Sequence, residues 1–168
     1  MNFAVFINGN LGLRVLEHLS GLESVKVKYI FLNSEFKRSS NYLDQVERLV
    51  LRKKLETQIV LWNQTQITLN PPSYKSWNVD FAISALFGHI IPPEVIANIP
   101  GGILNLHPSL LPVGRGAHPV SWNIIERKSQ GITIHLVDKD LDTGEEIPAT
   151  AEKKEDRKPA TRKRTPKA

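Results

Sequence analysis

The sequence predicts a domain of the α/β class with a largely parallel sheet. Short apolar runs of strand length recur along the chain, and segments with apolar residues at helical intervals separate them. Strands that alternate with helices in this way are typical of a parallel sheet covered by helices. The chain has 168 residues, enough for one such domain that buries roughly two thirds of its unfolded surface.

The first half of the chain is expected to contain three strands and two helices. We expect strands at residues 2–7, 25–32 and 59–62, and helices built on Leu13, Leu16 and Leu19 and on Leu43, Val46, Leu49 and Val50. The turn after the first strand reads Asn8-Gly9-Asn10-Leu11-Gly12 and lacks the Gly-x-Gly-x-x-Gly pattern of dinucleotide sites. This segment is therefore more typical of a tight turn with a residue at positive φ than of a nicotinamide or flavin site.

The second half continues the alternation around a central loop. We expect strands at residues 79–85, 103–107 and 131–137, and helices at residues 92–98 and 117–127. Pro108, Pro112, Gly114 and Gly116 disfavour regular structure in the loop after the second of these strands. In the last strand, Thr133 and His135 are expected on one face and three apolar residues on the other.

Two polar residues interrupt the apolar run at residues 103–107. Asn105 and His107 are two apart, so both side chains share a face near the carboxyl end of a strand, where α/β folds bind ligands. Asp142 lies in a turn-rich loop at residues 138–144. Singly, these residues could be a loop cap, a buried packing histidine and a turn former. Together they predict acid–base chemistry through an oxyanion, because a carboxylate can orient the histidine while the amide donates.

The segment at residues 86–91 follows another strand and places apolar residues around Gly88. Such a loop suits the wall of a site for a flat ring system, because glycine allows close approach of the backbone. A hydrophobic turn that closes the core explains the same pattern. Both interpretations stay open at this point.

Composition excludes several classes of protein. The chain has no cysteine, which excludes disulfides, a thiolate nucleophile and cysteine-ligated metal. His107, His118 and His135 lack the paired spacing of zinc sites, so we expect no metal. No apolar run approaches the roughly 18 residues of a membrane span, and the first residues lack the charged start of a signal peptide. We therefore expect a cytoplasmic protein with no membrane partner.

The net charge of +5 is confined to the last residues of the chain. Residues 151–168 hold eight basic and three acidic residues, whereas residues 1–150 hold 14 of each. A nucleic-acid-binding domain would carry a basic face on its folded body, so a nucleic-acid partner is not expected. The basic segment could still act as a nucleic-acid arm, although such runs are more often merely solvated.

The motifs resemble those of the folate-dependent formyltransferases. The matching segments are Asn105-Leu-His-Pro-Ser-Leu-Leu-Pro112, Arg115-Gly116, Pro119, Trp122, Gly131-Ile-Thr-Ile-His135 and Leu141-Asp-Thr-Gly144. The resemblance covers about residues 1–147 and implies a Rossmann-like domain that moves a formyl group from 10-formyltetrahydrofolate to an amine.

The resemblance also implies roles for particular residues. The catalytic residues would be Asn105, His107 and Asp142, with Asp142 orienting a protonated His107 while Asn105 and His107 hold the oxyanion. The folate site would comprise Leu86, Phe87, Gly88, His89, Ile90, Ile91, Asp138 and Leu141. Acceptor-binding positions would be Asn8, Gly9, Asn10, Ser109, Arg115 and Gly116.

Three acceptor classes are compatible with these motifs. The segment from Arg115 to Trp122, together with the Gly-Ile-Thr-Ile-His and Leu-Asp-Thr-Gly motifs, is most similar to the sugar N-formyltransferases, which act on nucleotide-linked amino sugars. Methionyl-tRNA formyltransferases and phosphoribosylglycinamide formyltransferases share the core motif and remain alternatives.

The end of the chain departs from the family pattern. We expect a catalytic domain at residues 1–147 and a basic, disordered tail at residues 148–168, since the tail has no large apolar side chain. Pro148 interrupts the expected strand, so the carboxyl end resembles a truncation. The corresponding alternative is a weakly active remnant, or a non-catalytic protein that binds folate or a sugar nucleotide.

Overall fold

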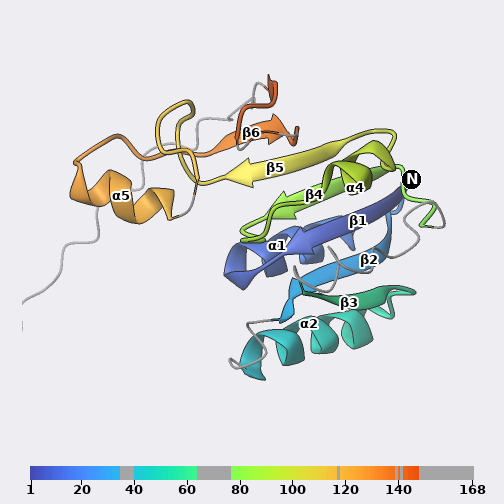
Figure 1. The fold of residues 1–168 in the computed structure, drawn as a ribbon. Helices are drawn as coiled ribbons and strands as arrows, with labels where there is room; N and C mark the ends of the chain where they lie inside the picture. Colours follow the sequence, from blue (N-terminus) through green and yellow to red (C-terminus); the bar gives the residue numbers. More distant parts are fainter. Residues whose placement is uncertain (35–39, 64–76, 117, 139, 141, 148–168) are drawn as a thin grey trace, which may run out of the picture.

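The computed structural model describes residues 1–34, 40–63, 77–116, 118–138, 140 and 142–147. Within these residues the strands form one sheet with the order β3-β2-β1-β4-β5-β6-β7 (Figure 1). The strands are β1 (Asn2–Ile7), β2 (Lys26–Asn33), β3 (Gln58–Trp62), β4 (Phe81–Ala85), β5 (Ile103–His107), β6 (Thr133–Leu136) and β7 (Glu146–Ile147). The helices are α1 (Gly9–Leu19), α2 (Ser40–Lys53), α4 (Pro93–Ala97) and α5 (Pro119–Ile125). The expected tail at residues 148–168 lies outside the described residues.

The α/β class with a largely parallel sheet is confirmed. Strands β1 to β5 pair in parallel, whereas β6 runs antiparallel to β5 and β7 antiparallel to β6. The carboxyl ends of β1, β4 and β5 therefore meet at one edge of the sheet. The Asn8 N–H donates to the Ala85 carbonyl at 3.0 Å and joins the loops that follow β1 and β4.

The turn after β1 is shorter than the sequence predicts. Helix α1 begins at Gly9, because the Asn8 side chain caps it by accepting the Gly9 N–H at 3.0 Å. Gly9 has φ +59°, as expected of a turn that needs a left-handed residue. Gly12 lies inside the helix, where a side chain would collide with Ile7 and the Tyr42 hydroxyl.

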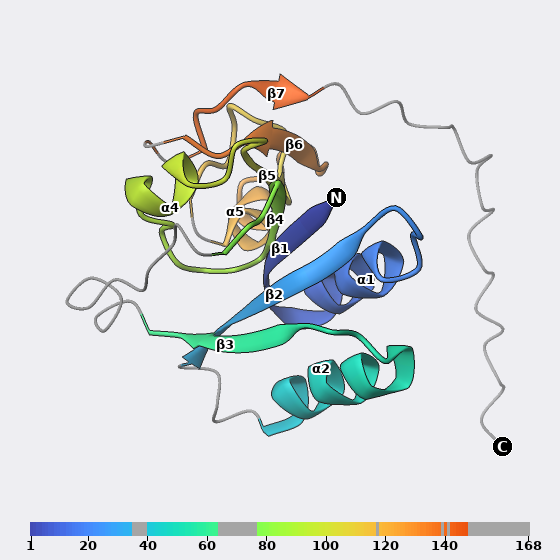
Figure 2. The same cartoon turned by 90° about the vertical axis from the view of Figure 1, so that its right-hand side faces the viewer.

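Apolar side chains fill both faces of the sheet. Helices α1 and α2 cover one face and α4 covers the other (Figure 2). On the α4 side, Phe6 stacks on Phe31 with ring centroids 4.5 Å apart and packs edge-on against Trp62 and Phe87. These buried rings form the core on the α4 side of the sheet, close to its carboxyl edge.

Helix α5 lies beyond the carboxyl ends of the parallel strands (Figure 1). The sequence predicts a helix here from its apolar residues, and the helix is present but shorter than residues 117–127. Its buried positions are Pro119 and Asn123, whereas Trp122, Ile124 and Ile125 are 55%, 66% and 70% exposed. The apolar residues that predict the helix therefore face outward.

No helix in the described part of the chain is both long and apolar enough to cross a membrane.

Tyr42 on α2 is partly buried and has a buried hydroxyl whose effect on stability can be tested. Its hydroxyl has no hydrogen-bond partner among the described residues, and burial raises the pKa of Tyr42. An unfolded tyrosine ionises near pH 10, so the unfolded state releases its proton first and stability falls as pH rises above about 10. We expect the melting temperature to fall less between pH 8 and pH 11 in Tyr42→Phe than in the wild type, as measured by thermal unfolding. An identical loss in both proteins would contradict this assignment.

Candidate active site

Strand β5 carries the two polar side chains that the sequence singles out. Asn105 lies opposite His135 and His107 lies opposite Thr133 in the antiparallel pairing with β6. Asn105 and His107 share a face, as their spacing predicts. His107 is buried, with 5% of its surface exposed. Both side chains are therefore held on a short central strand at the carboxyl edge of the sheet.

Asp142 reaches these residues by a route that the sequence does not indicate. Sequence reasoning places its loop at the same edge as the end of β5, but β6 is antiparallel and ends beside the start of β5. The Val137 N–H donates to the Ile103 carbonyl at 2.8 Å, which marks that distant end. The chain then turns back, and Asp142 adopts φ +51°, a left-handed conformation that aspartate tolerates.

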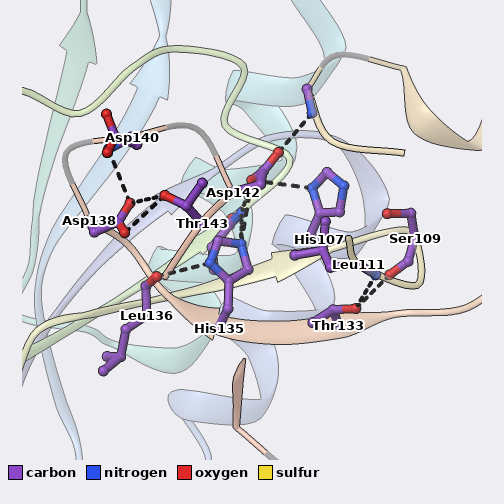
Figure 3. A network of polar contacts seen from close by, with 12 residues as sticks. His107, Ser109, Leu111, Thr133, His135, Leu136, Asp138, Asp140, Asp142 and Thr143 are labelled. Carbon is purple, nitrogen blue, oxygen red and sulfur yellow. Dashed lines mark hydrogen bonds and ion pairs between the residues drawn. The ribbon is translucent and has the colours of Figure 1, made fainter. Parts of the chain in front are cut away.

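The Asp142 carboxylate is the centre of the polar network in Figure 3. Its Oδ1 lies 3.5 Å from His107 Nδ1, 3.4 Å from His135 Nε2 and 3.4 Å from Asn105 Nδ2. Its Oδ2 accepts the Gly116 N–H at 2.8 Å. The side chain is only 8% exposed, so its charge is stabilised mainly by these groups. The structure thus brings Asn105 and His107 together around the Asp142 carboxylate.

The hydrogen bonds of His107 fix the position of one ring proton. Its Nε2 lies 2.7 Å from the Gly114 carbonyl oxygen, which can only accept, so Nε2 carries a proton. Its Nδ1 faces Asp142, so Nδ1 is the ring nitrogen that can gain or lose a second proton.

His135 is a site residue that sequence reasoning does not assign. It is 2% exposed, and its Nδ1 lies 2.9 Å from the Leu136 carbonyl and therefore donates to it. In the neutral ring Nε2 then accepts from the Asn105 amide at 3.1 Å. The signal in the sequence is a polar residue that alternates with apolar ones in β6. Its significance depends on the register with Asn105, which the pattern does not contain.

The loop at residues 108–116 has no helix or strand among its described residues, as its prolines and glycines predict. Ser109, which the resemblance places among the acceptor-binding positions, is completely buried, and its hydroxyl donates to the Val113 carbonyl at 2.8 Å. Its hydroxyl therefore holds the loop rather than facing a ligand. Arg115 is exposed in the same loop, and Gly116 contributes its N–H to Asp142.

The loop at residues 86–91 has features of both a hydrophobic turn that closes the core and a wall for a flat ring system. Phe87 and Ile91 are buried in the core, whereas Leu86 and Ile90 are 42% and 70% exposed. Gly88 and Leu86 both have positive φ, which turns the backbone sharply there. His89 packs edge-on against Phe87 with ring centroids 5.6 Å apart, and its Nε2 is buried without a partner among the described residues. The loop therefore closes the core and also presents an unsatisfied polar atom.

The remaining predicted positions belong to the start of α1 and to the segment after β6. Asn8 caps α1 and Asn10 is exposed on its first turn. Asp138 accepts the Thr143 hydroxyl at 2.8 Å and the Asp140 N–H at 3.1 Å, which stabilises the turn before Asp142. Leu141 lies outside the described residues. Within the described residues, no group of three or more His, Cys, Asp or Glu side chains is arranged to hold a metal ion.

Curated relatives match parts of this chain. The methionyl-tRNA formyltransferase of Thermodesulfovibrio yellowstonii is 45% identical over 71 residues, which cover 42% of this chain and 23% of that protein. The corresponding protein of Caldanaerobacter subterraneus is 37% identical over 105 residues, which cover 60% of this chain and 32% of that protein. The chain thus matches a third or less of the length of these relatives.

A solved structure and a family model match most of the chain. The phosphoribosylglycinamide formyltransferase of Anaplasma phagocytophilum superposes with a TM-score of 0.67 and 22% identity, over 90% of this chain and 74% of that one. This likeness shows the fold, a Rossmann-like sheet. The model of the formyl transferase family matches residues 2–155, which include every strand and the whole Asn105–His107–Asp142 arrangement. The chain is therefore a member of the formyl transferase family.

Proposed function

We propose that this chain transfers a formyl group from 10-formyltetrahydrofolate to an amine. The observation that carries the proposal is the convergence of Asn105, His107 and His135 on the buried Asp142 carboxylate, all within 3.5 Å of Oδ1. Acyl transfer from an amide-like donor needs hydrogen-bond donors where negative charge develops and a group that moves a proton. Asn105 supplies an amide donor and His107 supplies both functions.

The residues that would hold the folate fit a flat heterocycle with polar edges. The exposed Leu86 and Ile90 offer apolar contact, and the buried, unpartnered Nε2 of His89 would offer a hydrogen bond once the loop moves to expose it. Gly88 leaves backbone groups open to close approach, since nothing lies within 4 Å of the position that its side chain would occupy. Asp138 and Asp142 would bound the other side. The bound folate would supply the formyl group.

Asn105, His107 and Asp142 would each have one task in the transfer. Asn105 Nδ2 has two hydrogens, of which one would stay on His135 Nε2 while the other turns from Asp142 to the formyl oxygen. As the acceptor nitrogen bonds to the formyl carbon and the folate nitrogen leaves it, His107, protonated at Nδ1 as well as Nε2, would give its Nδ1 proton to the departing nitrogen, and the proton that the amine loses would restore it. Asp142 would stabilise that protonated ring and orient it. Donors of this kind contribute on the order of 3 kcal/mol each to acyl-transfer rates.

The acceptor we favour is the amino group of a nucleotide-linked sugar. The support is the motif content, namely the segment from Arg115 to Trp122 together with the Gly-Ile-Thr-Ile-His and Leu-Asp-Thr-Gly motifs. The alternative is a methionyl-tRNA acceptor, which the curated relatives favour because both are methionyl-tRNA formyltransferases. A phosphoribosylglycinamide-type acceptor fits the same core.

The test is a transfer assay with 10-formyltetrahydrofolate and a panel of acceptors, followed by folate absorbance. The panel contains nucleotide-linked amino sugars, methionyl-tRNA and glycinamide ribonucleotide, and His107→Ala is the control. Turnover with a sugar nucleotide that His107→Ala lacks would support the proposal. Turnover with methionyl-tRNA alone would show that the acceptor is methionyl-tRNA and not a sugar nucleotide. A folded protein that binds folate but transfers nothing would instead identify a binding protein.

His135 provides a further prediction for this site. We expect His135→Ala to lower kcat on the order of 10-fold, because the Asn105 amide loses the acceptor that orients it. KM for the folate donor should change little, since His135 is buried and does not line the folate loop. Steady-state kinetics would check this, with His18→Ala on α1 as the control. An unchanged kcat would contradict the orienting role.

A further inference from the structure

The hydroxyl of Thr133 anchors the start of the loop that follows β5. Thr133 is 9% exposed, and its Oγ1 donates to the Ser109 carbonyl at 2.7 Å and accepts the Leu111 N–H at 3.0 Å. Thr133 is also the residue of β6 that lies opposite His107. One side chain on the sheet thus sets where the loop leaves the strand.

Ser109 continues the connection inside the loop. Its Oγ lies 2.8 Å from the Val113 carbonyl oxygen and 3.2 Å from the Gly114 carbonyl oxygen. Gly114 has φ +75°, and a side chain there would lie 3.1 Å from Ser109 Cβ and 3.3 Å from Asn123 Oδ1. Ser109 and Asn123 therefore pack against Gly114, and the Ser109 hydroxyl also contacts its carbonyl oxygen.

The Gly114 carbonyl then acts on His107, whose Nε2 it meets at 2.7 Å. A histidine in the neutral state can carry its proton on either ring nitrogen, and the hydrogen-bond partners decide which. Without this carbonyl, the Asp142 carboxylate beside Nδ1 would favour the proton on Nδ1. With it, the proton is held on Nε2, and Nδ1 is free to exchange a proton with Asp142 and the reacting groups.

We propose that Thr133 and Ser109 are positioning residues that, through the Gly114 carbonyl, hold the neutral His107 ring in its Nε2–H form. This deepens the proposed function and rests on it for its effect on catalysis, but not for its effect on the ring. Neither residue touches a reacting group. Their hydroxyls determine which nitrogen of His107 exchanges the proton.

The test compares variants that remove or retain each hydroxyl. Ser109→Ala removes it with little change in volume, Thr133→Val removes it at constant shape, and Thr133→Ser restores it. Long-range ¹H–¹⁵N spectra of the His107 ring, assigned with His107→Gln, report the tautomer. We expect the wild type and Thr133→Ser to show Nε2–H, and Ser109→Ala and Thr133→Val to gain Nδ1–H. In the transfer assay we expect kcat to fall on the order of 10- to 100-fold in the hydroxyl-free variants with KM nearly unchanged.

Ser20→Ala is the matched control, because Ser20 also donates its hydroxyl to a backbone carbonyl, that of Glu17, but on α1. It should change neither the spectrum nor kcat. If Thr133→Val does not fold, Ser109→Ala carries the test. A wild-type His107 tautomer and kcat in a folded Ser109→Ala would overturn the proposal. If the wild type transfers no formyl group, the proposed function fails, while the spectra still decide the positioning role.

Discussion

Replacing Asp142 by asparagine is expected to lower kcat by roughly 10²–10³-fold. Oδ1 of Asp142 faces three nitrogen atoms and Oδ2 faces the Gly116 N–H. On one side the new NH₂ group would meet the Asn105 amide donor, and on the other it would meet the Gly116 N–H, so a donor meets a donor in either orientation. The negative charge that stabilises protonated His107 is also lost. Asparagine tolerates the left-handed conformation of position 142, so the backbone preference is preserved.

Transfer kinetics and a thermal melt would check this prediction together. Asp44→Asn is the control, because Asp44 is exposed on α2, and it should leave kcat unchanged. A folded Asp142→Asn protein with wild-type kcat would remove Asp142 from the catalytic residues.

The second large effect is expected on stability. Gly144 follows the Asp142 turn where the chain passes close to β6, and a side chain there would overlap the carbonyl of Leu136. The Leu136 carbonyl is part of the backbone and cannot rotate away as a side chain can. The Leu136 N–H also donates to the carbonyl of the next residue, Glu145, at 2.9 Å, which holds the two segments together. Gly144→Ala should therefore cost about 3 kcal/mol or more and lower Tm on the order of 10 °C.

The same substitution should also separate Asp142 from its partners, because residues 142–145 would have to shift as a unit. We expect transfer activity to fall below a tenth of wild type even at temperatures where the variant is folded. Calorimetry and transfer kinetics would measure the two effects. Gly21→Ala is the comparison, since its side chain would come no closer than 3.3 Å to the His18 carbonyl. Equal melting temperatures for the two variants would contradict the argument.

Sequence reasoning predicts which polar residues lie together better than it predicts how they are arranged. The spacing of Asn105 and His107 predicts a shared face, and a carboxylate in a turn-rich loop is a plausible partner. The direction of β6 is not predictable, since an apolar run of that length fits either direction in a sheet. For that reason the reversal of the chain before Asp142, and the pairing of His135 with Asn105, emerge only from the structure.

Ser109 and Phe87 show a second limit. A serine in a loop at a strand end and an aromatic residue in a glycine-containing loop both indicate ligand contact in the sequence. In the structure the serine hydroxyl binds loop carbonyls and the phenyl ring packs on Phe6 and Trp62. A local pattern can place a residue near a site, but the neighbours that compete for its side chain come from distant segments.

The outward-facing side chains of α5 have a consequence for how the molecule opens. Because Trp122, Ile124 and Ile125 already contact water in the native state, unwinding this helix exposes little additional apolar surface. Its opening should therefore depend only weakly on denaturant and contribute little to the heat capacity of unfolding. Amide protons of α5 should exchange through local fluctuations, well before those of β1 and β4. The loop whose Gly114 carbonyl contacts His107 thus adjoins, through Asn123, a helix that should open before these strands.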